Sequence, residues 1–119
     1  MTDTETILFA NDVFYRAFDD QDPKSMDRLW SQKFSVCCVH PGWGPIYVRK
    51  EIIKSWVAIM TNPEAPKIRC LDAKAEIYGD MAVILTISLD TLEVRHYSWW
   101  WIVVKSGGLW SVRGNWLIL

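Results

Sequence analysis

The hydrophobic pattern of this chain changes once, near residue 66, and that change constrains the fold more than any other feature. Before it, apolar residues recur at the three- and four-residue spacing of helices; after it, they alternate as in strands. Helices followed by an antiparallel run of strands define an α+β protein. No repeat or linker interrupts the 119 residues, so we expect a single domain spanning residues 1–119.

The first half predicts three helices. An apolar stripe from Ile7 to Phe18 marks the first, with Asp3 or Thr4 as its N-cap. The pair Asp22-Pro23 starts a short second helix that ends near residue 32. The third helix runs from about residue 49 to residue 60. A strand at 34–40 and a loop rich in proline and glycine precede it.

The second half predicts four strands, at residues 68–78, 81–89, 93–105 and 109–118, the first kinked near Asp72. Gly79-Asp80 and Gly107-Gly108 are the expected hairpin turns. All odd positions from 81 to 89 are apolar, so that face is predicted to be buried. The last turn predicts that Lys105 pairs with Trp110 and Trp101 with Gly114.

The composition excludes several classes of protein. Thirteen basic residues against fourteen acidic ones argue against a nucleic-acid binder held by a basic surface. No run of about 18 apolar residues exists to span a membrane. The acidic, polar start does not resemble a signal peptide, so we expect a cytoplasmic protein with reduced cysteines. Eight tryptophans indicate an aromatic core, an aromatic pocket or a partner surface.

Three segments carry a resemblance to a known family: FYRAFDDQDPKSMDRLW, VCCVHPGWGP and RKEIIKSW. They resemble the SnoaL-like branch of the nuclear transport factor 2-like superfamily, which includes ketosteroid isomerase and polyketide cyclases. The resemblance implies three helices packed on a strongly curved, mostly antiparallel sheet, a cone-shaped, cystatin-like α+β roll. It also implies an apolar pocket inside the cone and a homodimer.

His40 is the candidate catalytic residue, because imidazole titrates near neutral pH and suits proton abstraction beside a carbonyl. The resemblance places it where ketosteroid isomerase relatives have their aspartate base. It places Phe14 where those relatives have a tyrosine that donates a hydrogen bond, which phenylalanine cannot do. The candidate substrate-binding residues are Tyr15, Cys38, Trp43, Trp56, Trp101 and Asn115.

Other interpretations of these residues stay open. His40 alone is not a catalytic set, and its ring can instead hold the loop by bonding a backbone group. Cys38 lies two residues before His40 on the same predicted strand face, so a thiolate–imidazole pair is an alternative. No Cys-x-x-Cys or His-x-x-x-His spacing and no glycine-rich phosphate loop occurs, so we expect neither a metal nor an organic cofactor.

Two functions follow from this sequence. The first is a small-molecule pocket protein, acting as an isomerase, cyclase or dehydratase on an apolar carbonyl compound with His40 as base. The alternative is a non-catalytic homodimeric association or ligand-binding module, with the run Trp99-Trp100-Trp101 turning one face to the core and one to a second subunit. A cavity of about 300 Å³ or more that reaches His40 would favour the first function, and a filled cone would favour the second.

Overall fold

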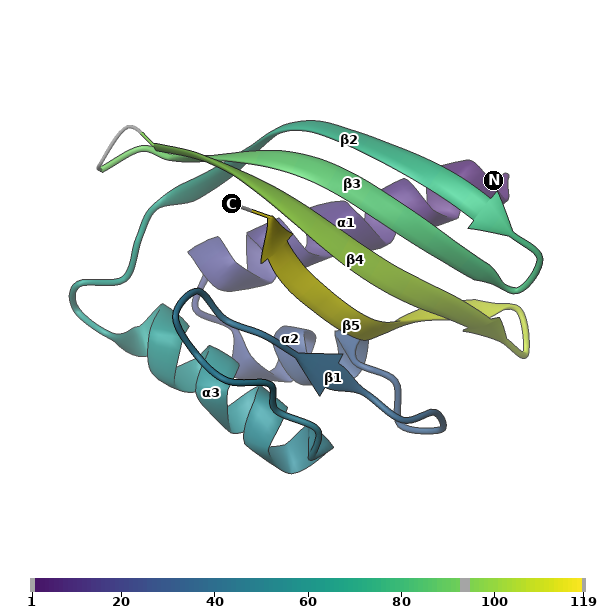
Figure 1. Ribbon diagram of the computed structural model, residues 1–119, viewed down its shortest axis with the longest axis horizontal. Coiled ribbons are helices and arrows are strands. Elements are labelled where there is room, and N and C mark those ends of the chain that lie inside the picture. The colour runs from purple at the N-terminus through teal and green to yellow at the C-terminus, as the bar shows by residue number, and fades with distance from the viewer. Residues whose placement is uncertain (1, 93–94, 119) are drawn as a thin grey trace.

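The computed structural model describes residues 2–92 and 95–118, and only the backbone of residues 95 and 116–118. The five strands form one sheet in the order β1-β5-β4-β3-β2, antiparallel except where β1 runs parallel to β5. The helix α1 crosses one face of the curved sheet, and α2 and α3 lie beside its β1 end (Figure 1). The elements are α1 (Asp3–Asp19), α2 (Pro23–Leu29), β1 (Cys37–Cys38), α3 (Arg49–Thr61), β2 (Ile68–Tyr78), β3 (Met81–Asp90), β4 (Arg95–Ser106) and β5 (Leu109–Ile118).

This arrangement confirms the α+β class and the mostly antiparallel sheet. The strand predicted at residues 34–40 is only two residues long, and the second helix ends at Leu29, three residues early. The kink expected in β2 appears as a register shift between Cys70 and Asp72. Both predicted hairpin turns are present, whereas Glu93 and Val94, predicted to open β4, lie outside the described residues.

The helix ends show how the local sequence sets the boundaries. The cap of α1 is Thr2 and not Asp3 or Thr4, since Thr2 and Glu5 form a reciprocal capping box. Asp22 caps α2 as predicted, and hydrogen bonds from Ser25 lower the pKa of its carboxyl. Arg49 opens α3 at the positive end of the helix dipole, but its guanidinium bonds Asp27 and three backbone carbonyls near the end of α2. These contacts hold α2 and α3 together.

The register of the last hairpin differs from the prediction. Lys105 pairs with Trp110 as expected, but a shift between Ile102 and Val103 pairs Trp101 with Asn115. The extra residue of this bulge moves Asn115 to the inner face, where it is 1% exposed. Gly114 therefore makes no room for an indole ring. A Cβ there would lie 3.1 Å from the Cys37 carbonyl oxygen, so glycine permits β1 to approach β5.

The predicted face of β3 is also reversed. The helices cover the even-numbered side chains, from Ala82 to Asp90, all of which are buried. The apolar odd-numbered side chains point away from the helices, and Met81 and Ile87 are 41% and 42% exposed. We use the name outer face for the odd-numbered side chains of β3 with Trp100 and Ile102, which lie opposite Leu85 and Val83 on β4. The alternation identified residues that avoid water, but not the side on which the helices lie.

Candidate active site

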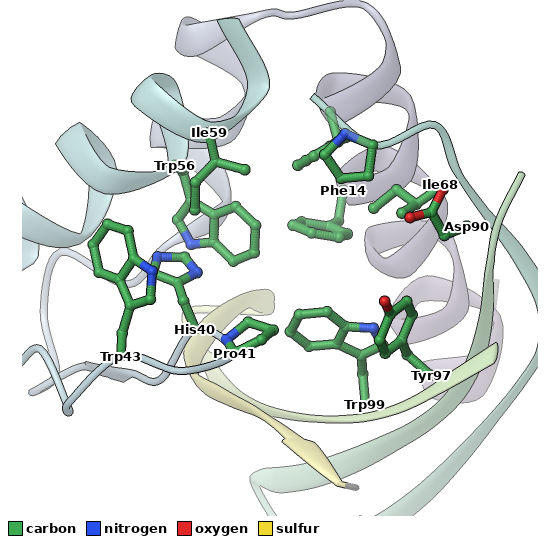
Figure 2. Close-up of a pocket in the computed structure, with 12 residues that line it drawn as sticks. Phe14, His40, Pro41, Trp43, Trp56, Ile59, Ile68, Asp90, Tyr97 and Trp99 are labelled. Atoms are coloured by element: carbon green, nitrogen blue, oxygen red, sulfur yellow. The ribbon is translucent and has the colours of Figure 1, made fainter. Parts of the chain in front are cut away.

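The helices and the concave face of the sheet enclose a cavity of about 250 Å³ that reaches His40. Figure 2 shows aromatic side chains from α1, α3, β4 and the loop after β1 surrounding this space. Its volume is slightly below the 300 Å³ at which ligand pockets usually begin, so it suits a small ligand. The lining residues are Phe14, Phe18, His40, Pro41, Trp43, Trp56, Ile59, Pro66, Ile68, Asp90, Tyr97 and Trp99.

His40 lies at one end of the cavity and is 2% exposed. Its Nε2 atom lies 2.7 Å from the Ser55 hydroxyl oxygen on α3 and 3.5 Å from the Cys38 sulfur. Among the described residues, both hydrogen-bonding contacts of the ring therefore use Nε2. Burial lowers the pKa of His40 to about 4, so the imidazole is neutral at neutral pH.

A tight turn carries His40 and Trp43 together. The Trp43 backbone N–H donates to the His40 carbonyl at 3.0 Å, with Pro41 and Gly42 between them and Gly42 at a φ of +78°. Proline followed by a residue with positive φ is typical of a type II turn. The Trp43 ring meets His40 edge to face at 4.9 Å and stays 50% exposed, so it stands at the mouth of the cavity.

Backbone hydrogen bonds join the two ends of the loop that carries this turn. Cys38 and Ile46 form an isolated antiparallel bridge with two hydrogen bonds of 2.8 and 2.9 Å. The Val39 N–H also donates to the Asn115 carbonyl at 3.3 Å, which ties the loop to β5. His40 and Trp43 are therefore presented by one closed loop.

Cys38 contacts Nε2 of His40 but does not line the cavity. Burial raises the pKa of its thiol to about 12, while the pKa of His40 falls to about 4. The proton therefore stays on sulfur, and this geometry supplies no thiolate for a nucleophilic pair. Cys37, Cys38 and Cys70 are all free.

Tyr15 points away from the cavity, toward β3. Its hydroxyl is bonded to the hydroxyls of Thr86 and Ser88, and burial raises its pKa to about 12. Phe14, the next residue on α1, lines the cavity instead. The hydroxyl of Tyr15 does not replace the donor that Phe14 lacks.

Trp101 and Asn115 lie one layer below the cavity. The Trp101 ring packs against Phe14 at 4.2 Å and against Trp56 at 6.3 Å, and neither Trp101 nor Asn115 is in its lining. Among the described residues, the buried Asn115 amide has no hydrogen-bond partner at either its nitrogen or its oxygen. Of the seven predicted site residues, His40, Trp43 and Trp56 meet at the cavity wall.

Four side chains of this site that carry hydrogen-bonding groups were not predicted from sequence to form it. Tyr97, Trp99 and Asp90 line the wall opposite His40, and the Asp90 carboxylate accepts the Leu92 backbone N–H at 3.0 Å. Ser55 bonds His40 from within the buried stripe of α3. A small polar residue on an otherwise apolar helix stripe was the available signal for Ser55.

Comparison with known families identifies the chain. The sequence profile of the SnoaL-like domain matches residues 7–119. The chain belongs to the SnoaL-like family. The match covers both halves of the hydrophobic pattern, and this confirms the resemblance drawn from the three short segments. No curated protein matches the chain.

Solved structures share the fold at low identity. A candidate dehydratase of the nuclear transport factor 2-like family from Streptomyces avermitilis aligns at a TM-score of 0.81 and 20% identity, over 95% of this chain and 93% of its own. A nuclear transport factor 2-like protein from Cytophaga hutchinsonii aligns at 0.75 and 14%, over 98% of both chains. The calcium/calmodulin-dependent protein kinase II hub of S. rosetta aligns at 0.74 and 12%, over 99% and 97%.

These similarities confirm the cone fold of the SnoaL-like chain. None of the helices in the described ranges is long and apolar enough to cross a membrane. Within the same ranges, no three His, Cys, Asp or Glu side chains are grouped so that they could hold a metal ion.

Proposed function

We propose that this SnoaL-like protein binds a small, flat, apolar carbonyl compound in its cavity and transfers a proton within it. The observation that carries the proposal is a neutral histidine at one end of a small, mostly aromatic cavity. Isomerisation, cyclisation and dehydration of a carbonyl compound all begin with such a transfer. The similarity to a candidate dehydratase supports this reaction class.

In the proposed reaction, His40 takes the proton from the carbon beside the carbonyl, on the ring nitrogen that faces away from Ser55. The electron pair of the broken C–H bond becomes the carbon–carbon double bond of an enolate, and the charge moves to oxygen. The protonated ring then returns the proton to carbon or to a leaving oxygen. Because burial opposes the charged imidazolium, the site must stabilise the enolate oxygen strongly.

The opposite wall carries the donors for that oxygen. Tyr97 has a phenolic hydroxyl and Trp99 an indole N–H, and both side chains line the cavity across from His40 (Figure 2). They would replace the donor absent at Phe14. The proposal keeps Trp43, Trp56 and Trp101 as walls that exclude water, Trp101 through its contact with Trp56.

The proposal gives Asn115 no ligand contact, because its side chain is 1% exposed and does not line the cavity. Asn115 pairs with Trp101 on β4 and Cys38 on β1, directly below the lining. The proposal leaves no ligand contact for Tyr15 and only a supporting role for Cys38.

The proton transfer is tested by deuterium exchange. We expect the purified protein to speed incorporation of deuterium beside the carbonyl of β-tetralone, a flat bicyclic ketone. His40→Gln is expected to lower the rate by about 10²- to 10⁴-fold, the usual contribution of a general base. The matched control is His96→Gln, because His96 is exposed on β4. Equal rates in His40→Gln and the wild type would remove His40 from the reaction.

A second proposed property is a homodimer through the outer face. This face is apolar along the full length of β3, yet the helices of the same chain leave it uncovered. Exposed apolar patches of this kind are typical of protein interfaces. The similarity to a kinase hub supports association of such folds. If the cavity binds no ligand, this association is the function that remains.

A further inference from the structure

The hydroxyl of Ser55 fixes the direction of a hydrogen bond. Its oxygen lies 2.6 Å from the Ile52 carbonyl oxygen and 2.7 Å from Nε2 of His40. A carbonyl only accepts, so the single hydroxyl proton of Ser55 must point to Ile52. Toward His40 the same oxygen can then only accept. Nε2 must therefore carry the ring proton.

The remaining groups around the ring agree with this assignment. The Cys38 thiol, 3.5 Å from Nε2, keeps its own proton because burial raises its pKa to about 12. The ring itself is neutral at neutral pH, so it carries only one proton. Nδ1 consequently carries no proton and can accept a hydrogen bond. Both hydrogen-bonding contacts of the ring among the described residues use Nε2, and Figure 2 shows one edge of the ring turned to the cavity.

The charge around the cavity decides what this acceptor can bind. None of the residues that line it is a lysine or arginine, and Asp90 adds a carboxylate to the wall. A carboxylate or phosphate ligand would meet the lone pair of Nδ1 and find no lysine or arginine in the lining to balance its charge. A neutral molecule that donates a hydrogen bond meets no such repulsion. The rings of Trp43 and Trp56 meet His40 edge to face, and most of the lining is aromatic, which suits a flat ligand.

We propose that Ser55 holds His40 in the tautomer with its proton on Nε2, so that the cavity presents Nδ1 as an acceptor and selects neutral, flat ligands that donate a hydrogen bond. Phenols, heteroaromatic N–H compounds and the enol forms of carbonyl compounds, including the enol of the proposed substrate, form this class. Ser55 is a positioning residue, since it acts through His40. The proposal rests on the cavity of the proposed function, but its first part concerns His40 alone.

Long-range proton–nitrogen correlation spectra of the imidazole rings test the tautomer without any ligand. The chain has two histidines, and His96 is exposed and serves as the internal reference. At neutral pH we expect His40 to show a protonated Nε2 and a bare Nδ1. Ser55→Ala is expected to raise the Nδ1-protonated fraction several-fold, and Ser55→Thr to restore the wild-type pattern.

Thr61→Ala is the matched control. Thr61 lies on the same helix, and its hydroxyl donates to the Val57 carbonyl at 2.6 Å without contacting His40. This variant loses a similar helix contact and should leave the His40 spectrum unchanged. A proton on Nδ1 in the wild type, or an unchanged tautomer in Ser55→Ala, would overturn the role of Ser55.

The ligand class is tested by calorimetry with β-naphthol, its methyl ether and β-naphthoate, which differ only at one substituent. One hydrogen bond of about 1 kcal/mol predicts that β-naphthol binds about five-fold tighter than the ether. The naphthoate anion should bind most weakly. Equal affinity of naphthol and ether would overturn the ligand class and leave the tautomer assignment standing. Loss of the proposed catalysis, shown by the exchange assay, would change neither result.

Discussion

The two faces of the central sheet differ in what covers them and in what they contain. Apart from Ile84, the inner face of β3 carries small or polar residues, and Thr86 and Ser88 there bond Tyr15 of α1. The outer face is wholly aliphatic along β3, yet Met81 and Ile87 are exposed. The more apolar face is thus the one that the chain itself leaves open. Apolar alternation indicates that a face is kept from water, and the covering group can be a second molecule.

Two adjacent tryptophans on β4 lie on opposite faces, and truncating them is expected to give the largest difference in stability between the faces. Trp101 is 3% exposed on the inner face, whereas Trp100 lies half-buried on the outer one. We expect Trp101→Ala to lower the free energy of unfolding by about 3–5 kcal/mol, as for other buried aromatic truncations. Trp100→Ala should lower it by about 1–2 kcal/mol in the monomer. Urea titration at low protein concentration measures both, and equal losses would contradict the assignment of the faces.

The inner face also predicts a dependence of stability on pH. An unperturbed histidine has a pKa of 6.5, whereas burial lowers the pKa of His40 in the folded chain to about 4. Between these values the unfolded chain takes up a proton that the folded chain does not, so the free energy of unfolding decreases as pH falls. The full effect is about 3 kcal/mol, reached near pH 4.

Denaturant titrations from neutral pH down to about pH 4 measure this decrease. At each pH, the free energy of unfolding of His40→Asn is subtracted from that of the wild type. The difference isolates the contribution of the ring, because the carboxylates titrate equally in both proteins. If the free energy of unfolding of His40→Asn changed with pH as steeply as that of the wild type above pH 4, the ring would not be buried as described.

The outer face predicts a change in association with little change in stability. Ile87→Lys places a charge at the centre of this face, and burying an unpaired ammonium in an interface is costly. We expect the dissociation constant of the dimer to rise by about 100-fold, or about 2.7 kcal/mol. Leu109→Lys, at the exposed β4–β5 turn, is the control. Sedimentation equilibrium distinguishes them, and a wild type that stays monomeric at micromolar concentration would contradict the interface.

Local sequence was sufficient to predict the helices and turns, because their signals lie within a few residues. Asp22-Pro23 started α2 and the paired glycines placed the last hairpin turn correctly. The face of β3 was wrong because alternation contains no information about which neighbour covers it. The pairing of Trp101 was wrong because the bulge after Ile102 has no signature in the turn residues.

The candidate site was predictable only in part for the same reason. His40, Trp43 and Trp56 stood out by residue type and position, and the structure brings them together. Ser55 acts across the space between α3 and the loop, and Tyr97 and Trp99 reach the cavity from the far strand. Contacts between distant segments depend on register and packing, which single-sequence patterns do not fix.

The bridge between Cys38 and Ile46 has a consequence for how such a protein diversifies. It closes the backbone on both sides of His40 and Trp43, so the histidine at one end of the cavity and the tryptophan at its mouth belong to one loop. Replacing the loop between Cys38 and Ile46 would alter the chemistry at His40 and the shape of the cavity entrance together, while the strands and their hydrogen bonds stay intact. Grafting it between homologues is therefore a direct route to new specificities on this scaffold.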